Sequence, residues 1–191
     1  LKRLSLQTTG KLLDGRAGLH IYFLLRALSL LERNGRLAFI MPADTCEGKF
    51  AHDLWRWIGA NYALDAVATF ASEASPFPGV DTNPLVFFIR HAKPRTTFFW
   101  ARCCEPQTEA LKLWARSDLA VVPGKALAVT TRDLSEGLAA GLSRPPAVHP
   151  TGRYVLGDFV HIMRGVATGA NEFFFLTDEQ AQQTGIPREY F

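Results

Sequence analysis

Chemistry in proteins often depends on histidines, nucleophile motifs or glycine-rich loops. In this sequence none of these features has the spacing that a functional site requires. The histidines are scattered without the spacing of metal ligands: His20, His52, His91, His149 and His161. No Gly-x-Ser-x-Gly elbow occurs, and no glycine-rich loop that could cradle a phosphate follows an apolar run. The sequence therefore predicts no metal site, no serine nucleophile and no phosphate-binding loop.

The three cysteines indicate free thiols. Cys103 and Cys104 are neighbours, and Cys46 lies far from both, so no Cys-x-x-Cys spacing exists. Neighbouring cysteines rarely pair with each other, and unpaired thiols are typical of a reducing compartment. We therefore expect a cytoplasmic protein without a disulfide framework.

The composition is that of a globular chain with a mild basic excess. Of the 191 residues, 48% are hydrophobic and 20% are charged, which excludes a disordered chain. The net charge of +3 permits an anionic partner without requiring one. The longest apolar segment, 21–31, is interrupted by Arg26 and Ser29 and is too short to span a membrane. The chain begins with Leu1 rather than Met, which indicates a fragment or a processed product.

The first half of the chain alternates between helical and strand-like patterns. Two segments have apolar residues at helical spacing, 17–33 and 49–62. Three apolar runs predict strands, 36–41, 64–70 and 85–89. This order is typical of an open α/β sheet.

Details of these segments lead to finer expectations. Asn34-Gly35 should end the first helix, because both residues accept the left-handed conformation of a helix end. The continuous apolar run 36–41 indicates a parallel strand that is covered on both faces. The lack of a helix between the last two strands indicates antiparallel neighbours at a sheet edge. Residues 1–16 are polar and expected to be irregular.

The character of the sequence changes after Arg90. A basic linker over 91–95 leads to a strand-like segment, 96–102, and then to short helical patterns. We place a domain boundary in this linker, with an α/β domain over 1–90 and a second region over 91–191. Three cations near the boundary predict weak, salt-sensitive binding to DNA: Lys93, Arg95 and Arg102.

Three segments carry a resemblance to one family. They are the helix and strand from His20 to Ala43, the loop Ser75–Thr82 with the strand after it, and Gly157–Phe174. In this order they resemble the downstream part of adenine-specific (N6) DNA methyltransferases of type II restriction-modification systems. The resemblance implies the C-terminal half of a Rossmann-like methyltransferase sheet within 1–90. It also implies part of an appended target-recognition module within 91–191.

Two motifs of that family are absent. The glycine-containing strand and loop that bind S-adenosylmethionine do not occur, nor does an Asn-Pro-Pro-Tyr or Asp-Pro-Pro-Tyr catalytic loop. Pro145-Pro146 follows Arg144 and precedes Ala147, so it offers neither an amide acceptor nor a stacking ring. The resemblance therefore implies a chain that contains no catalytic residue, that binds S-adenosylmethionine weakly or not at all, and that is inactive alone. Its implied partners are double-stranded DNA and a missing N-terminal methyltransferase half.

The resemblance also implies roles for five residues. Phe77 matches the ring that stacks on the flipped-out adenine, although it could instead pack under its Pro-rich loop. Phe23 matches the aromatic residue that lies against the adenine ring of the cofactor, although it could instead belong to the core. Arg164, Thr168 and Asn171 match a recognition element that approaches phosphates or base edges, although their glycine-rich segment could instead be an ordinary turn.

Two other functions are compatible with these residues. One is a DNA-recognition or specificity module that has no chemistry of its own and works with a separate catalytic chain. The other is a relative that methylates RNA or a small molecule.

Overall fold

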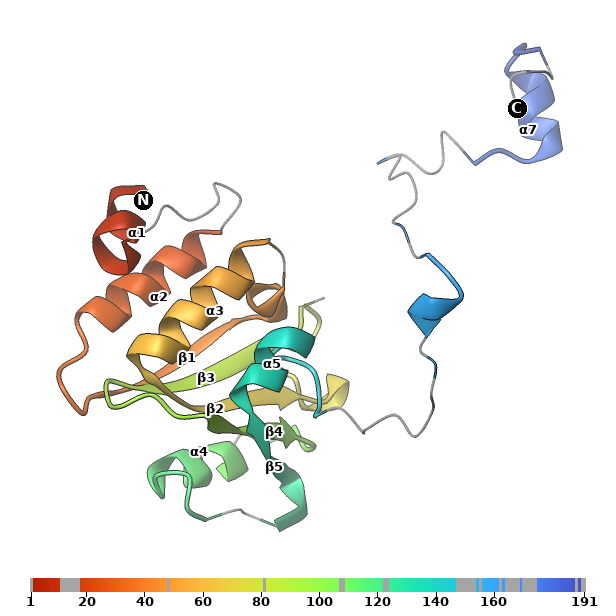
Figure 1. Ribbon diagram of the computed structural model, residues 1–191. Helices are drawn as coiled ribbons and strands as arrows, with labels where there is room; N and C mark the ends of the chain where they lie inside the picture. Colours follow the sequence, from red (N-terminus) through yellow and green to blue (C-terminus); the bar gives the residue numbers. More distant parts are fainter. Residues whose placement is uncertain are drawn as a thin grey trace. The chain divides into compact units, whose positions relative to one another are not determined.

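The chain forms two compact units. The computed structural model describes residues 2–10, 18–47, 49–80, 82–106, 109–121, 124–146, 154, 156–161, 163, 169, 175–187 and 189. The larger unit spans Leu1–Val148 and the smaller His149–Phe191. Figure 1 traces the elements of each unit along the sequence.

The elements of the larger unit alternate between helices and strands. Its helices are α1 (Lys2–Thr9), α2 (Leu19–Ser29), α3 (Lys49–Asn61), α4 (Glu109–Arg116) and α5 (Leu134–Ala140). Its strands are β1 (Arg36–Pro42), β2 (Ala63–Phe70), β3 (Pro84–Arg90), β4 (Thr97–Cys103) and β5 (Leu127–Asp133). Short 3₁₀ turns are η1 (Ala43–Cys46), η2 (Ser72–Ala74) and η3 (Gly124–Ala126). The expected α/β class is confirmed.

The five strands form one sheet in the order β1-β3-β2-β4-β5. Strand β3 pairs antiparallel with both β1 and β2, so β1 and β2 run in the same direction on its two sides. Strand β4 is parallel to β2, and β5 is antiparallel to β4. The expected antiparallel pairing of β2 with β3 is confirmed, but β3 lies inside the sheet and not at its edge.

Strand β1 differs from the expectation of a parallel strand covered on both faces. It lies at one end of the strand order and pairs antiparallel with β3. Its side chains alternate, with Arg36, Ala38 and Ile40 exposed and Leu37 and Phe39 half-buried. The prediction was wrong because a continuous apolar run does not reveal whether neighbouring elements cover both faces of a strand.

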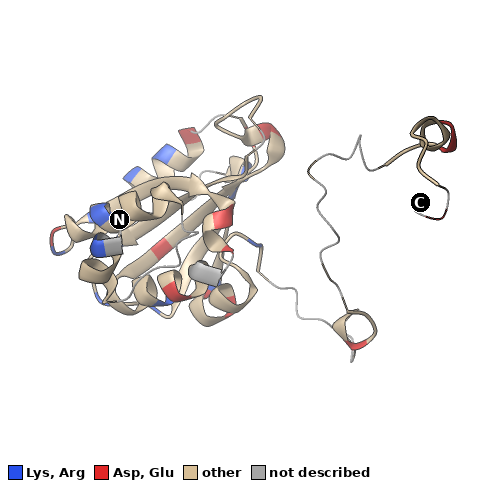
Figure 2. Cartoon of the chain, turned by 90° about the horizontal axis from the view of Figure 1, so that it is seen from above, with Lys and Arg blue, Asp and Glu red and all other residues tan. Residues whose placement is uncertain are grey.

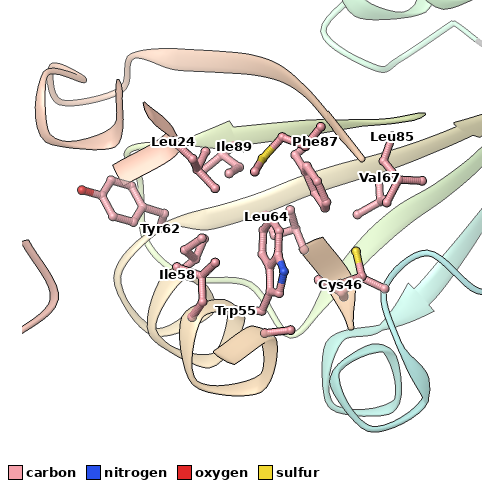
Figure 3. Close-up of a cluster of buried hydrophobic side chains, with 14 of the residues drawn as sticks. Leu24, Cys46, Trp55, Ile58, Tyr62, Leu64, Val67, Leu85, Phe87 and Ile89 are labelled. Carbon is pink, nitrogen blue, oxygen red and sulfur yellow. The ribbon is translucent and has the colours of Figure 1, made fainter. Parts of the chain in front are cut away.

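One face of the sheet supports the main core. Helices α2 and α3 lie over this face (Figure 1), and α5 packs against the same cluster of buried side chains. Figure 3 shows the centre of the cluster, where Trp55 lies against Phe87 with ring centroids 4.2 Å apart. The indole nitrogen of Trp55 donates a hydrogen bond of 2.8 Å to the carbonyl of Thr45, so its polar atom is satisfied inside the core.

Helix α4 covers part of the opposite face. Its Trp114 is fully buried and meets the rings of Phe88 and Phe99 edge-on, at centroid distances of 5.9 and 6.0 Å. The indole nitrogen donates to the carbonyl of Leu119 at 3.1 Å. One aromatic residue therefore fixes α4 and the turn after it on the middle of the sheet.

The first helices depart from their predicted bounds. Residues 2–9 form α1, which contacts α2 and buries Ser5 completely, although residues 1–16 were expected to be irregular. Helix α2 ends at Ser29, before the predicted end at residue 33. Asn34 does adopt the left-handed conformation, with φ of 64°, but its N–H donates to the carbonyl of His91 at 2.9 Å. The residue therefore shapes the turn into β1 and does not cap the helix.

The sheet continues past the boundary placed near 91–95. Strand β4 starts at Thr97 and pairs with β2 through five residues, and β5 extends the sheet further. The chain divides into compact units at residue 148 instead. A polar connection between two strands of one sheet has the same composition as an interdomain linker, so composition alone predicts a boundary at 91–95 where the sheet continues.

The smaller unit contains η4 (Leu156–Asp158) and α7 (Asp178–Gln183). A capping box begins α7, because the hydroxyl of Thr177 accepts from the N–H of Gln180 while the Gln180 side chain accepts from the N–H of Thr177. Several large apolar side chains of this unit are exposed: Tyr154, Leu156, Phe159, Met163 and Phe175. The described part of this unit therefore lacks a buried core of its own.

A buried arginine joins β5 to the segment after α5. The Arg132 side chain is 1% exposed and forms a bidentate ion pair with Glu136. Its remaining nitrogen donates to the carbonyls of Gly141 and Arg144, at 3.0 and 2.6 Å. Because every hydrogen-bond partner of this guanidinium comes from the same short region, Arg132 fixes the path of the chain as it leaves α5.

We expect Arg132→Leu to lower the free energy of unfolding by about 3–5 kcal/mol, because it leaves a carboxylate and two carbonyls without their donor. Urea unfolding followed by circular dichroism measures this loss. Arg102→Leu, an exposed arginine on the adjacent strand β4, is the matched control and should change stability little. Equal losses in the two variants would contradict the structural role of Arg132.

Candidate functional site

The carboxyl ends of three strands meet at one edge of the sheet. Strands β1, β2 and β4 run in the same direction, so the segments after Pro42, Phe70 and Cys103 lie at this edge. Strand β3 runs the other way and begins there, at Pro84. Ligands of open α/β sheets bind outside the carboxyl ends of the strands, so this edge is the candidate site.

The loop between β2 and β3 presents Phe77 at the candidate edge. The Phe77 side chain is 43% exposed, and two prolines, Pro76 and Pro78, flank it. The N–H of Phe77 donates to the hydroxyl of Ser75 at 3.3 Å, and its carbonyl accepts from Val80 at 3.3 Å. Phe77 is therefore not part of the buried core. Stacking on a base and packing under the Pro-rich loop both stay predictions.

Phe23 is a second exposed aromatic residue. It lies in the first half of α2 and is 66% exposed, while its neighbours Tyr22 and Leu24 are buried. A six-residue turn, 30–35, joins the end of α2 to the start of β1, so the first half of α2 points toward the carboxyl edge (Figure 1). The core alternative is contradicted here too, and the role against a cofactor stays a prediction.

The three predicted recognition residues are not placed by the structure. Arg164, Thr168 and Asn171 lie outside the described residues. Their predicted role in recognition stays a prediction.

The cations near the predicted boundary do not form one cluster. Lys93 and Arg95 precede β4, whereas Arg102 lies near its carboxyl end, five residues beyond Thr97. Five residues of strand span roughly 17 Å, so these charges lie toward opposite edges of the sheet. Arg95 is also engaged, with a nitrogen 3.5 Å from a carboxylate oxygen of Asp65. In the view of Figure 2, basic and acidic residues are interspersed over the larger unit.

An ion-pair network that was not predicted from the sequence lies at the opposite, amino edge. Arg90 on β3 contacts the buried Asp65 on β2 at 2.8 Å and Asp118 at 2.9 Å. Asp118 also contacts Arg36 on β1 at 2.8 Å. The hydrogen bond to Asp65 is the main reason that the pKa of Arg90 is raised above its usual value. A buried aspartate inside an apolar strand was the available signal, because such a charge requires a partner.

A cavity of about 270 Å³ lies between η1, α3 and α5. Cys46, His52 and Trp55 line one side of it, and Glu47 and Arg144 lie 3.8 Å apart among its lining residues. Burial raises the pKa of the Cys46 thiol to about 12, so this sulfur is protonated at neutral pH and is no nucleophile. The cavity therefore offers no ionised thiol for covalent catalysis.

Metal binding and membrane crossing find no support in the part of the chain that the structure describes. No cluster of three or more histidine, cysteine, aspartate or glutamate side chains there could hold a metal ion. None of the described helices is long and apolar enough to cross a membrane.

Comparison with solved structures shows the fold. No family model matches the sequence. The type IIG restriction endonuclease BpuSI is similar with a TM-score of 0.55 and 16% identity, over 71% of this chain and 17% of that chain. The methyltransferase subunit of a type I restriction-modification system from Streptococcus thermophilus gives a TM-score of 0.49 and 15% identity, over 70% and 30% of the two chains.

A chain from a structure of a type I restriction-modification system gives a TM-score of 0.49 and 16% identity, over 69% of this chain and 34% of that chain. This protein therefore spans about a third or less of the length of the structures that it matches. At these identities the likeness concerns the α/β fold alone.

The three thiols should differ in reactivity. Burial raises the pKa of Cys46 to about 12 and that of Cys103 to about 11, whereas Cys104 is partly exposed. At pH 8 roughly 1 in 10⁴ Cys46 side chains is ionised, so we expect iodoacetamide to label Cys104 and to spare the other two. Mass spectrometry of peptides from native and urea-unfolded protein measures this. Labelling of native Cys46 as fast as Cys104 at pH 8 would contradict its burial.

Proposed function

We propose that this chain is the downstream part of an S-adenosylmethionine-dependent DNA adenine-N6 methyltransferase of a restriction-modification system, inactive without an upstream half. The observation that carries the proposal is the exposed Phe77, held on a Pro-flanked loop at the carboxyl edge of an α/β sheet. The fold similarity to BpuSI, a type IIG restriction endonuclease, supports the same class.

The geometry suits a residue that stacks on a base. A methyltransferase acts on a base that has left the duplex, and the lost stacking must be replaced in the protein. The Phe77 ring is exposed, and the hydrogen bonds at both of its backbone groups brace the loop that carries it. A preorganised aromatic ring loses little conformational freedom when a base arrives, so it stabilises the flipped state.

The residues of this chain fit S-adenosylmethionine only in part. Phe23 offers an exposed aromatic wall near the candidate edge, but the sequence lacks the glycine-containing loop that would bind the rest of the cofactor. When bound to the intact enzyme, the cofactor supplies the methyl group. The upstream half would supply the Asn-Pro-Pro-Tyr or Asp-Pro-Pro-Tyr loop, whose acceptors raise electron density on the adenine amino nitrogen.

The remaining assignments follow from the same proposal. Double-stranded DNA is the substrate, and the segment with Arg164, Thr168 and Asn171 in the smaller unit begins the target-recognition region. The part up to residue 90 contributes the end of the catalytic sheet. Strands β4 and β5 extend that sheet before the recognition region, and α4 covers part of its face. With three free thiols, the protein would work in the cytoplasm.

Substitutions of Phe77 in the intact parent enzyme separate stacking from packing. We expect Phe77→Ala to slow methylation about 10- to 100-fold, because base–aromatic stacking is worth roughly 1–3 kcal/mol. Phe77→Trp should retain most of the rate, since it keeps an aromatic face, and Phe77→Leu should lose much of it. Methyl transfer to a duplex oligonucleotide measures the rates. Thermal unfolding of the same variants is the control, and normal methylation by Phe77→Leu with early melting of Phe77→Ala would contradict the role.

Calorimetric titration of this chain with S-adenosylmethionine tests whether the cofactor site lies mainly in the upstream half. We expect weak or no binding, because micromolar affinity needs about 8 kcal/mol and one aromatic wall cannot supply it. The intact parent is the positive control. Micromolar binding by this chain alone would show that it contains a cofactor site, contrary to the proposal.

A further inference from the structure

Four residues of the loop between β2 and β3 form a tight turn at the carboxyl edge of the sheet. The N–H of Val80 donates to the carbonyl of Phe77 at 3.3 Å, which closes a β-turn over Phe77-Pro78-Gly79-Val80. The proline ring holds φ of Pro78 at about −65°. Gly79, the next residue, has a φ of 77°. A negative φ followed by a positive φ at the two central positions defines a type II turn.

Gly79 occupies the position of this turn that side chains disfavour. A left-handed φ is unfavourable for a residue with a Cβ, whereas glycine adopts it freely. Lack of space is not the reason for the glycine, because a Cβ added there would meet no atom of the described residues within 4 Å. The glycine is therefore required for the backbone conformation of the turn alone.

Both ends of the loop are anchored, so the turn decides where the tip of the loop points. On the β2 side, Ala74 is fully buried in the cluster that α4 covers. On the β3 side, the carbonyl of Asn83 accepts from the N–H of Ala43 at 2.8 Å. Between these anchors the hydroxyl of Ser75 accepts from the N–H of Phe77 at 3.3 Å. A change of turn type would therefore move the Phe77 ring relative to the fixed ends of the loop.

The buried core does not depend on this turn. Pro78 and Gly79 are exposed, and the side chains of Phe77 and Val80 are 43% and 60% exposed. The first and last residues of a β-turn lie within about 7 Å of each other, so these two apolar side chains are neighbours. A surface turn that holds an aromatic ring in one conformation, and contributes little to the core, is suited to contact with a ligand.

We infer that Gly79 is a positioning residue for the target base, because the type II turn that it permits holds the Phe77 ring where a flipped-out adenine stacks on it. This inference rests on the function proposed above and adds a residue that acts through Phe77. With alanine at position 79, the left-handed turn would be the conformation of a minor fraction of the molecules. The affinity for the flipped base then falls by that fraction.

Binding of the intact parent enzyme to two duplex oligonucleotides tests this role. One duplex carries the target adenine, and the other carries an abasic site at that position. We expect Gly79→Ala to weaken binding to the adenine duplex about 5- to 30-fold, which corresponds to the 1–2 kcal/mol cost of a left-handed alanine. Binding to the abasic duplex should stay within about twofold, because no base is there to stack. Equal losses on the two duplexes would overturn the inference, since they would show a general structural effect.

Two further variants are matched controls. Gly79→Asn should keep binding to the adenine duplex within about threefold, because asparagine tolerates the left-handed conformation. Asn34→Ala places alanine at another left-handed position, with φ of 64°, at the amino edge of the sheet. It should leave the preference for the adenine duplex unchanged. Gly79→Asn as impaired as Gly79→Ala, or Asn34→Ala with the same loss of preference, would contradict the role of this turn.

Comparison with Phe77→Ala separates this inference from the proposed function. Because Gly79 acts through Phe77, Gly79→Ala should add no further loss when Phe77→Ala is already present. A further loss of full size would overturn the inference. Impaired binding by Phe77→Ala together with normal binding by Gly79→Ala would also overturn it, and would leave the proposed function standing. Normal methylation by Phe77→Ala would sink the proposed role of Phe77, and the role of Gly79 with it.

Discussion

The reversed strand β3 between β1 and β2 is the constraint on which the arrangement depends. Because β2 and β3 are antiparallel neighbours, the chain between them must turn back at the carboxyl edge of the sheet. The loop between them, 71–83, carries Phe77 and therefore lies at the carboxyl edge. The same reversal makes β1 parallel to β2, so the turn η1 after β1 also lies at this edge. The antiparallel pairing of β3 with β1 and β2 therefore places the loops of the candidate site at the same edge of the sheet.

The amino and carboxyl edges of the sheet differ in the side chains that they carry. At the amino edge, Arg90 and Asp65 tie β3 to β2, and Asp118 ties the turn after α4 to Arg36 on β1. A carboxylate as buried as Asp65 is tolerated only because cations surround it. The carboxyl edge instead presents an exposed ring, Phe77, on a loop held by backbone and hydroxyl hydrogen bonds. The ion pairs thus join strands at the amino edge, whereas the carboxyl edge presents an aromatic ring to solvent.

The sequence predicted the elements of the larger unit better than their arrangement. The apolar runs gave β1, β2 and β3 within a few residues, because such runs need burial wherever they lie. The runs did not predict whether other elements cover both faces of β1, since an edge strand and an interior strand both keep one apolar face against the core. Helix α1 was missed because contact with α2, and not an apolar pattern of its own, stabilises it.

The surroundings of individual side chains, like the arrangement of the strands, were harder to predict than the elements themselves. The resemblance singled out Phe77 and Phe23, and local pattern could not decide between core and surface for either ring; exposure decided it. Lys93, Arg95 and Arg102 seemed close in sequence, but a strand separates them by its full length. Arg132 was overlooked because its partners, Glu136 and two backbone carbonyls, are brought together only by the end of α5. Contacts that depend on a turn have no signature in the types of residues alone.

Helix α2 has more apolar surface than its own core uses. Its inner face buries Ile21, Leu24 and Leu28, which suffices to hold the helix on the sheet. Leu19 and Phe23, one turn apart and both exposed, form a second apolar stripe on another face. Single exposed apolar residues are normal on any protein, but a stripe at helical spacing is a continuous surface. The stripe lies in the first half of α2, at the end that points toward the carboxyl edge of the sheet, where the loop with Phe77 also lies.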